Sequence, residues 1–216
     1  MASEHPRVRA LLERHGTTYA EEAGITLDDK PSPLYRLMVL SLLLSARISA
    51  GIATAAAREL SRAGCRTPAR MAEASWQDRV DALGRGHYRR YDERTSTMLG
   101  DGAEALIKDY GGDLRRLHRD ASSTRELERL LQRYPGIGPT GSAIFCREVQ
   151  GVWPDVAPYL DKRVRDGAGR LGLPETAAEL AELVPTAELP RLTAGCVRAA
   201  LDSAVADDVL YAGASR

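Results

Sequence analysis

A glycine-dependent turn stands between two segments that have helical periodicity. Gly136 and Gly138 lie one residue apart in "YPGIGPTGSA", between the charged "TRELERLLQR" and the apolar "SAIFCREV". Glycine adopts backbone angles that a Cβ forbids, so such a turn can leave consecutive N–H groups free where a helix starts at Pro139. A helix start with unpaired donors and positive dipole can bind a phosphate. The alternative is a plain corner between two helices, and the turn alone does not decide between them.

A single acid follows at the start of a later helix. In "APYLDKRVRDGAGRLGL" (157–173), Asp161 comes after an apolar stretch and just before a charged helical segment. A carboxylate in this place can take part in chemistry, cap the helix, or do both. Asp155 and Asp166 are the competing acids in the same region.

The elements that must position these residues are predicted to be helical, and no segment has the pattern of a strand. The segment 33–46 is apolar nearly all round, which predicts a buried central helix. Residues 17–32 have no sustained period and are expected to form a loop, whereas 189–211 is expected to be one helix. Two helix starts carry capping-box patterns, Ser75-x-x-Asp78 and Ser123-x-x-Glu126. We predict an all-α fold.

Composition narrows the class of protein. The chain has 216 residues and 44% hydrophobic content, enough for a sizeable core. No run approaches the roughly 18 apolar residues of a membrane helix, and "MASEHPRVRA" lacks the apolar core of a signal peptide. We therefore expect a cytoplasmic protein with no membrane partner. The net charge is zero, and the excess of 11 Lys/Arg over 8 Asp/Glu in residues 112–170 is only a weak indication of a nucleic-acid partner.

The cysteines do not form a metal-binding pattern. Cys65, Cys146 and Cys196 stand far apart, and no C-x-x-C pair is present. This spacing argues against a zinc ribbon, an iron–sulfur cluster and a disulfide framework. We expect core thiols and no metal or redox cofactor.

The order of the motifs resembles the helix-hairpin-helix DNA glycosylases of the endonuclease III and adenine glycosylase superfamily. Their pattern is L-P-G-V-G-x-x-T-A, an apolar helix, often W-P, then V-D-T-H-V-x-R-V-x-x-R-L-G-L. "RYPGIGPTGSAI" matches the first part, and "YLDKRVRDGAGRLGL" matches the second with Asp161 and Val164 in register. Upstream, "LSLLLSARIS" and "ALGRGHYRRYDER" resemble the family's L-x-x-x-L-S-A-Q-x-T and G-x-Y-x-x-K-A segments. The resemblance runs from about residue 36 to residue 173.

The resemblance implies a two-lobed helical glycosylase that acts on double-stranded DNA containing a damaged or modified base. One lobe would be a helical barrel, residues 33–138, ending in the hairpin. The other would join 1–32 to 139–216. The enzyme would hydrolyse the N-glycosidic bond of a flipped base as a monomer. The sequence does not indicate which base is excised.

Roles follow by position within the matched motifs. Asp161 aligns with the family's catalytic carboxylate, which would stabilise positive charge on the sugar or activate water. The segment from Thr140 to Asp161 is longer than the family's usual spacing, which leaves Asp155 and Asp166 as competitors. The hairpin residues Gly136, Ile137, Gly138 and Thr140 would bind the DNA backbone.

A threonine stands where bifunctional family members carry their Schiff-base lysine. Thr140 occupies that position, and the hairpin contains no lysine. Lys162 adjoins Asp161, but neighbouring helical residues point about 100° apart. We therefore predict a monofunctional glycosylase with absent or weak abasic-site lyase activity. The alternatives are a lyase-active enzyme that uses Lys162 and a non-catalytic DNA-binding protein.

Several arginines are candidate DNA contacts. Arg47 takes the place of the family's glutamine in "LSAQ", a residue that fills the gap left by the flipped base. Arg89, Lys162 and Arg163 are further candidates, although each can also be a solvated surface residue. Tyr88 is expected to pack in the core. The four-cysteine cluster that many family members carry is absent from this sequence, so we expect no iron–sulfur cluster.

Overall fold

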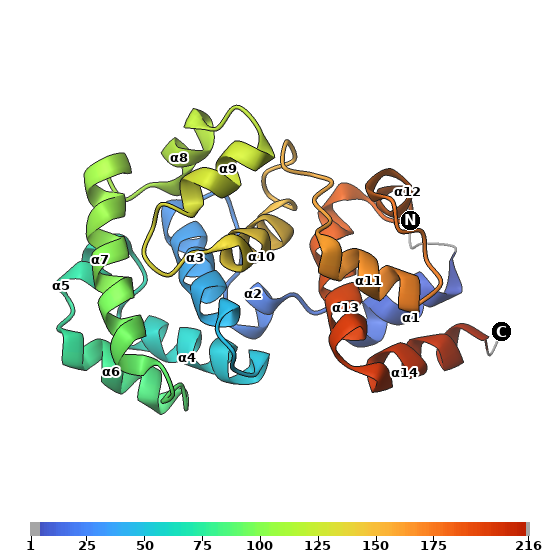
Figure 1. The fold of residues 1–216 in the computed structure, drawn as a ribbon, viewed down its shortest axis with the longest axis horizontal. Coiled ribbons are helices and arrows are strands. Elements are labelled where there is room, and N and C mark those ends of the chain that lie inside the picture. Colours follow the sequence, from blue (N-terminus) through green and yellow to red (C-terminus); the bar gives the residue numbers. More distant parts are fainter. Residues whose placement is uncertain (1–4, 215–216) are drawn as a thin grey trace. The chain divides into compact units, whose positions relative to one another are not determined.

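The computed structural model describes residues 5–214, and within that range the chain is all-α with no strand. The all-α prediction is therefore confirmed. Contacts between Cα atoms divide the chain into two compact units (Figure 1). Unit 1 comprises Met1–Thr18 and Arg147–Arg216, and unit 2 comprises Tyr19–Cys146. These divisions lie at 18/19 and 146/147, whereas the expected lobes were bounded at 32/33 and 138/139. No helix of the described range is long and apolar enough to cross a bilayer.

The helices of unit 2 lie around α3, which is drawn in blue in Figure 1. Its fifteen residues, Pro31–Ser45, include a run from Leu37 to Leu43 that is entirely buried, as the all-round apolar pattern predicted. Burying such a helix on all sides requires neighbours on every face. The other helices of the unit are α2 (Tyr19–Glu22), α4 (Ala50–Arg62), α5 (Pro68–Glu73), α6 (Trp76–Arg85), α7 (Asp92–Tyr110), α8 (Leu114–Asp120) and α9 (Thr124–Leu131); α10 (Pro139–Val149) begins in it.

Unit 1 is built on α13 (Leu189–Leu201), which contacts α1 (Pro6–His15), α11 (Lys162–Arg170) and α14 (Ser203–Ala214). Two glycines allow close approach of these helices. A Cβ on Gly167 of α11 would lie 1.8 Å from the backbone oxygen of Cys196, and one on Gly195 would lie 2.7 Å from Cγ of Leu11. The short α12 (Ala177–Glu182) and the 3₁₀ turn η1 (Thr186–Glu188) precede α13. The position of α11, and of the residue that begins it, is thus set by a backbone-to-backbone contact.

The structure differs from the sequence expectations in three elements. The expected loop 17–32 contains α2, whose Tyr19 and Ala20 are buried although one turn is too short to show a period. The helix α8 was not anticipated. The expected single helix over 189–211 is broken at Asp202, which has extended backbone angles and accepts the Ala204 N–H at 2.9 Å. An aspartate that bonds its own backbone two residues on competes with helical hydrogen bonds, which explains the break.

The capping patterns have different outcomes. Ser75 and Asp78 form the reciprocal box that was predicted. Ser123 accepts the Glu126 N–H, but the Glu126 carboxylate bonds Ser122, one residue earlier than the box requires. These hydrogen bonds from Ser122 lower the pKa of Glu126 to about 2.

Candidate functional site

The hairpin forms in unit 2, but the expected need for glycine holds for the first of its two glycines and is wrong for the second: Gly138 has no positive φ, and a Cβ there would meet nothing within 4 Å. Gly136 has φ +84°, and a Cβ there would lie 2.6 Å from Cδ1 of Leu42 on α3. The Ile137 N–H donates to the Tyr134 carbonyl at 3.0 Å, and the Ile137 side chain is buried. Gly136 is therefore required twice, for its left-handed backbone and for its close approach to α3.

The second helix of the hairpin starts with free backbone donors. Within the described residues, the N–H groups of Gly138, Thr140 and Gly141 donate to no acceptor. The Gly138 carbonyl accepts the Ser142 N–H at 3.0 Å, and the buried Ser142 hydroxyl accepts a hydrogen bond from the Gln132 amide at 3.0 Å. The Gln132 contact ties the end of α9 to the first turn of α10. The Thr140 side chain is exposed beside these donors. This arrangement can accept an anionic oxygen.

Asp161 is the N-cap of α11, and both of its carboxylate oxygens have partners. Oδ1 accepts the Val164 N–H at 3.0 Å, and Oδ2 accepts from Nη1 of Arg147 at 2.6 Å. The Asp161 side chain keeps 21% of its surface exposed, whereas the Arg147 side chain keeps 9%. The predicted cap role of Asp161 is therefore present, together with an ion pair to the last turn of α10.

The segment before Asp161 is held by a buried glutamine. The Gln150 amide nitrogen donates to the carbonyls of Arg147 and Tyr159 at 2.9 and 3.3 Å, and its oxygen accepts the Tyr159 N–H at 2.9 Å. Trp153 and Val156 of the same segment are buried. Sequence reasoning missed both Arg147 and Gln150. Their signal was a group of three polar residues, Arg147, Glu148 and Gln150, directly after the apolar run 143–146.

The rival residues near Asp161 have other surroundings. Asp166 and Lys162 pair with each other along α11 at 2.7 Å, and 81% of the Lys162 side chain is exposed. Asp155 is exposed in a turn, and Arg163 is exposed on the first turn of α11. Arg170 donates to the Ala199 carbonyl at 3.2 Å, so it ties α11 to α13.

Arg47 and Gly136 line the same hollow in unit 2, which has a volume of about 430 Å³. Arg47 is exposed on the bend after α3, and Arg94 lies on α7. Neither guanidinium has a hydrogen bond or an ion pair among the described residues. Tyr88 is buried as expected, and burial raises its pKa. The hollow is also lined by Leu42, Ser45, Ala46, Tyr91, Thr95 and Met98.

Arg89 is exposed in the loop before α7. It follows His87, a non-glycine residue with φ +64°, and Tyr88. The turn therefore buries the Tyr88 side chain and leaves the side chain of the next residue, Arg89, exposed to solvent.

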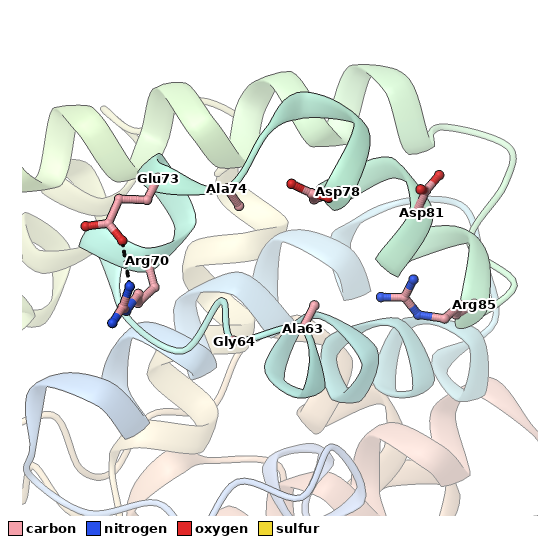
Figure 2. A pocket seen from close by; sticks show the side chains of 8 residues that line it. All are labelled: Ala63, Gly64, Arg70, Glu73, Ala74, Asp78, Asp81 and Arg85. Carbon is pink, nitrogen blue, oxygen red and sulfur yellow. Dashed lines mark hydrogen bonds and ion pairs between the residues drawn. The ribbon is translucent and has the colours of Figure 1, made fainter.

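A second hollow of unit 2, of about 480 Å³, differs in charge (Figure 2). It is lined by two arginines and three acids together with Ala63, Gly64 and Ala74. Each charged side chain has a partner: Arg70 with Glu73, Asp78 with Ser75, Asp81 with Gln77, and Arg85 with Glu59. This hollow is electrostatically satisfied, whereas the Arg47 hollow holds two unpaired cations and no acid.

The cysteines do not fit an iron–sulfur cluster. Cys65, Cys146 and Cys196 are buried, and none forms a disulfide. Cys65 and Cys146 belong to unit 2 and Cys196 to unit 1. Burial raises the pKa of Cys196 to about 12, which opposes the thiolate form that ligation requires. Three separated thiols cannot supply a four-cysteine ligand set. The described residues also contain no cluster of three or more His, Cys, Asp or Glu side chains able to hold a metal.

Comparison with known proteins identifies the fold. No family model matches the chain. No curated protein matches it. A solved structure of a non-covalent endonuclease III–DNA complex is similar over 88% of this chain and 83% of that chain, with 15% identity and a TM-score of 0.51. A structure of a trapped covalent endonuclease III–DNA intermediate, an estranged-adenine complex, is similar over the same fractions of the two chains, with 18% identity and a TM-score of 0.48. The chain has the helical fold of endonuclease III, as the motif order predicted.

Proposed function

We propose that this protein is a DNA glycosylase that removes a damaged or modified base from double-stranded DNA. The observation that carries the proposal is Asp161, a carboxylate fixed at the start of α11 and still 21% exposed, in a chain with the endonuclease III fold. The hairpin supports it with free N–H groups at Gly138, Thr140 and Gly141. A solved structure of that fold, similar to this chain, is an endonuclease III–DNA complex. A DNA phosphate is the anion that these donors would bind.

The proposed chemistry is hydrolysis at the sugar. As the bond between C1′ and the base nitrogen breaks, positive charge develops on the sugar ring. The Asp161 carboxylate would stabilise this charge or orient the water that attacks C1′. The products would be the free base and an abasic site. Access to C1′ requires the nucleotide to leave the stack, and Arg47 is proposed to fill the gap.

The proposed enzyme is monofunctional. A lyase step needs an unprotonated amine that attacks C1′ and forms a Schiff base. Thr140 stands in the hairpin position of the family lysine, and the amine of Lys162 is held by both oxygens of Asp166, at 2.8 and 2.7 Å. An ammonium group bound to a carboxylate is a poor nucleophile, which supports a hydrolytic reaction without strand cleavage.

The remaining parts of the proposal concern partners and cofactors. Arg89, Arg163 and the hairpin are proposed to contact the DNA backbone, since exposed guanidinium groups bind phosphates well. We propose that the enzyme works as a monomer and without a metal or iron–sulfur cluster. The separate burial of the three cysteines supports the latter.

A panel of duplexes, each containing one lesion, tests the proposal. Each duplex would be incubated with the wild type and with Asp161→Asn, then analysed with and without hot alkali. We expect a strand break that requires alkali and disappears in the variant. Borohydride trapping should give no covalent adduct with either protein. A trapped adduct would contradict the monofunctional mechanism, and DNA binding without excision of any lesion would favour a non-catalytic binding protein.

A further inference from the structure

An arginine is buried in the last turn of α10. Arg147 follows Ile144, Phe145 and Cys146 on α10, and it is 7% exposed. Burying a guanidinium is unfavourable unless a charged partner compensates for the lost hydration. Among the described residues, the Asp161 carboxylate is the one hydrogen-bond partner of the Arg147 side chain, at 2.6 Å. Arg147 is thus a buried cation whose charge is paired with the Asp161 carboxylate.

The helix end that carries Arg147 is itself anchored. The Gln150 amide bonds the Arg147 carbonyl and also brackets the backbone of Tyr159, two residues before Asp161. Gln150 is fully buried. The same buried amide therefore joins the backbone at Arg147 to the backbone two residues before Asp161. This anchoring exceeds what a helix cap needs, because the Val164 N–H alone satisfies the cap.

We propose that Arg147 is a positioning residue for Asp161, an inference that rests on the proposed glycosylase function. The Val164 N–H bonds one oxygen and Arg147 bonds the other, so rotation of the carboxylate would break a hydrogen bond at each oxygen. Each carboxylate oxygen has about two acceptor sites, so one site on each oxygen stays available for the sugar or for the attacking water. A fixed carboxylate reaches its reacting geometry without reorganisation when the substrate binds.

A positioning role and a purely structural role predict different kinetics. If Arg147 only stabilises unit 1, Arg147→Gln lowers the unfolding temperature, and the protein that remains folded excises bases at the wild-type rate. If Arg147 positions Asp161, the folded variant binds DNA normally and reacts slowly. The deciding quantities are the single-turnover rate with excess enzyme and the dissociation constant for the same duplex, each measured below the unfolding temperature.

The experiment uses the full chain with Arg147→Gln, Arg147→Lys, Asp161→Asn and the double variant. We expect Arg147→Gln to lower the single-turnover rate by about 30-fold, the scale seen when a hydrogen bond that orients a functional group is removed. The dissociation constant should change by less than about two-fold. Arg147→Lys should restore part of the rate, because it keeps one charged donor. The double variant should react no more slowly than Asp161→Asn, since Arg147 acts through Asp161. Arg115→Gln, which removes another arginine that binds a helix-capping aspartate, should leave the rate unchanged.

Other outcomes overturn the inference. A wild-type rate in folded Arg147→Gln makes the arginine structural, and weaker DNA binding at an unchanged rate makes it a DNA contact. If the rate losses of the two single variants multiply in the double variant, Arg147 does not act through Asp161. If Arg147→Gln does not fold, Arg147→Lys decides the question, because it keeps a positive charge beside Asp161 but not the geometry of the guanidinium. A rate below that of the wild type with unchanged DNA binding supports positioning, and a wild-type rate overturns it. A wild type that excises nothing would remove the proposed function and this inference together, whereas an active wild type with an equally active Arg147→Gln removes only the inference.

Discussion

Two aspartates of this protein cap helices and bind arginines, yet they are held in different ways. Asp113 caps α8, accepts the Arg115 N–H at 3.0 Å and binds the Arg115 guanidinium at 2.7 Å, so both partners lie two residues away. Asp161 caps α11, but its arginine comes from α10, fourteen residues earlier. Arg115 keeps 37% of its side chain exposed and Arg147 keeps 9%. The first pair is a local feature of the chain, whereas the second exists only when α10 and α11 are correctly folded.

The difference separates a cap that only stabilises its helix from a cap whose carboxylate is also held in place by another helix. A local cap with an exposed arginine stabilises its own helix and little else, because solvent screens the pair. A cap with a buried arginine from another helix is fixed relative to the fold, which is what a reacting group requires. The three predictions below test this contrast, from the largest expected effect to the smallest.

The largest effect is expected from replacing the two aspartates by asparagine. Asp161→Asn removes the charge at the proposed reaction centre, and we expect the single-turnover excision rate to fall by about 10³-fold, the scale of a lost electrostatic stabiliser. Asp113→Asn keeps a capping side chain and should leave the rate unchanged. Asp161→Asn also leaves the buried Arg147 without its charged partner and should lower the unfolding temperature, so rates are compared at a temperature where circular dichroism shows both variants folded. Equal losses in the two variants would remove the distinction between the caps.

A stability experiment tests whether Asp161 depends on tertiary packing. Gly167→Ala would place a Cβ 1.8 Å from the Cys196 backbone oxygen, so α11 must move away from α13. We expect the free energy of unfolding to fall by about 3 kcal/mol, with slower excision in the folded fraction because α11 carries Asp161. Urea unfolding and single-turnover assays measure the two effects.

Gly84→Ala is the matched control for this experiment. A Cβ on Gly84 of α6 meets nothing within 4 Å. Alanine in a helix loses less backbone entropy on folding than glycine, so the free energy of unfolding should rise by about 0.5 kcal/mol. A Gly167→Ala variant as stable as the wild type would show that α11 is not positioned by its contact with α13.

The features that the sequence predicted are local ones, and those that it did not predict depend on tertiary contacts. The cap at Asp161, the reciprocal cap at Ser75 and the glycine turn at Gly136 depend on neighbours within a few residues, and the sequence predicted all three. The break at Asp202 is also local, but the apolar pattern across it hid the competing side chain.

The partners of the site were not predictable in this way. Arg147 and Gln150 appeared as polar residues directly after an apolar run, because their contacts are with residues 9 to 14 positions later in the chain. Periodicity reports which face of a helix is buried, not which buried polar group meets which. The shared hollow of Arg47, Arg94 and Gly136 likewise joins α3, α7 and the hairpin.

The smallest effect is expected from the local pair, and it appears as pH dependence of stability. The hydrogen bond from Arg115 holds the pKa of Asp113 below its ordinary value of 3.8. A carboxyl group whose pKa is lowered in the folded state stabilises the protein above its unfolded pKa, and this contribution is lost as the pH falls through the folded pKa. Wild type should therefore exceed Asp113→Asn in free energy of unfolding by at most about 1 kcal/mol near neutral pH, because Arg115 is partly exposed and solvent screens the pair.

The measurement is urea unfolding of the two proteins from about pH 6 to about pH 3. The difference between them should stay constant at the higher values and shrink once the pH passes below the ordinary pKa of aspartate. Glu126, whose pKa is also lowered, is present in both proteins and cancels in the difference. High salt should reduce the difference near neutral pH, since it screens an exposed pair. A difference that persists at low pH and in high salt would mean that Asp113 is held by more than its local arginine, and the two caps would then be alike.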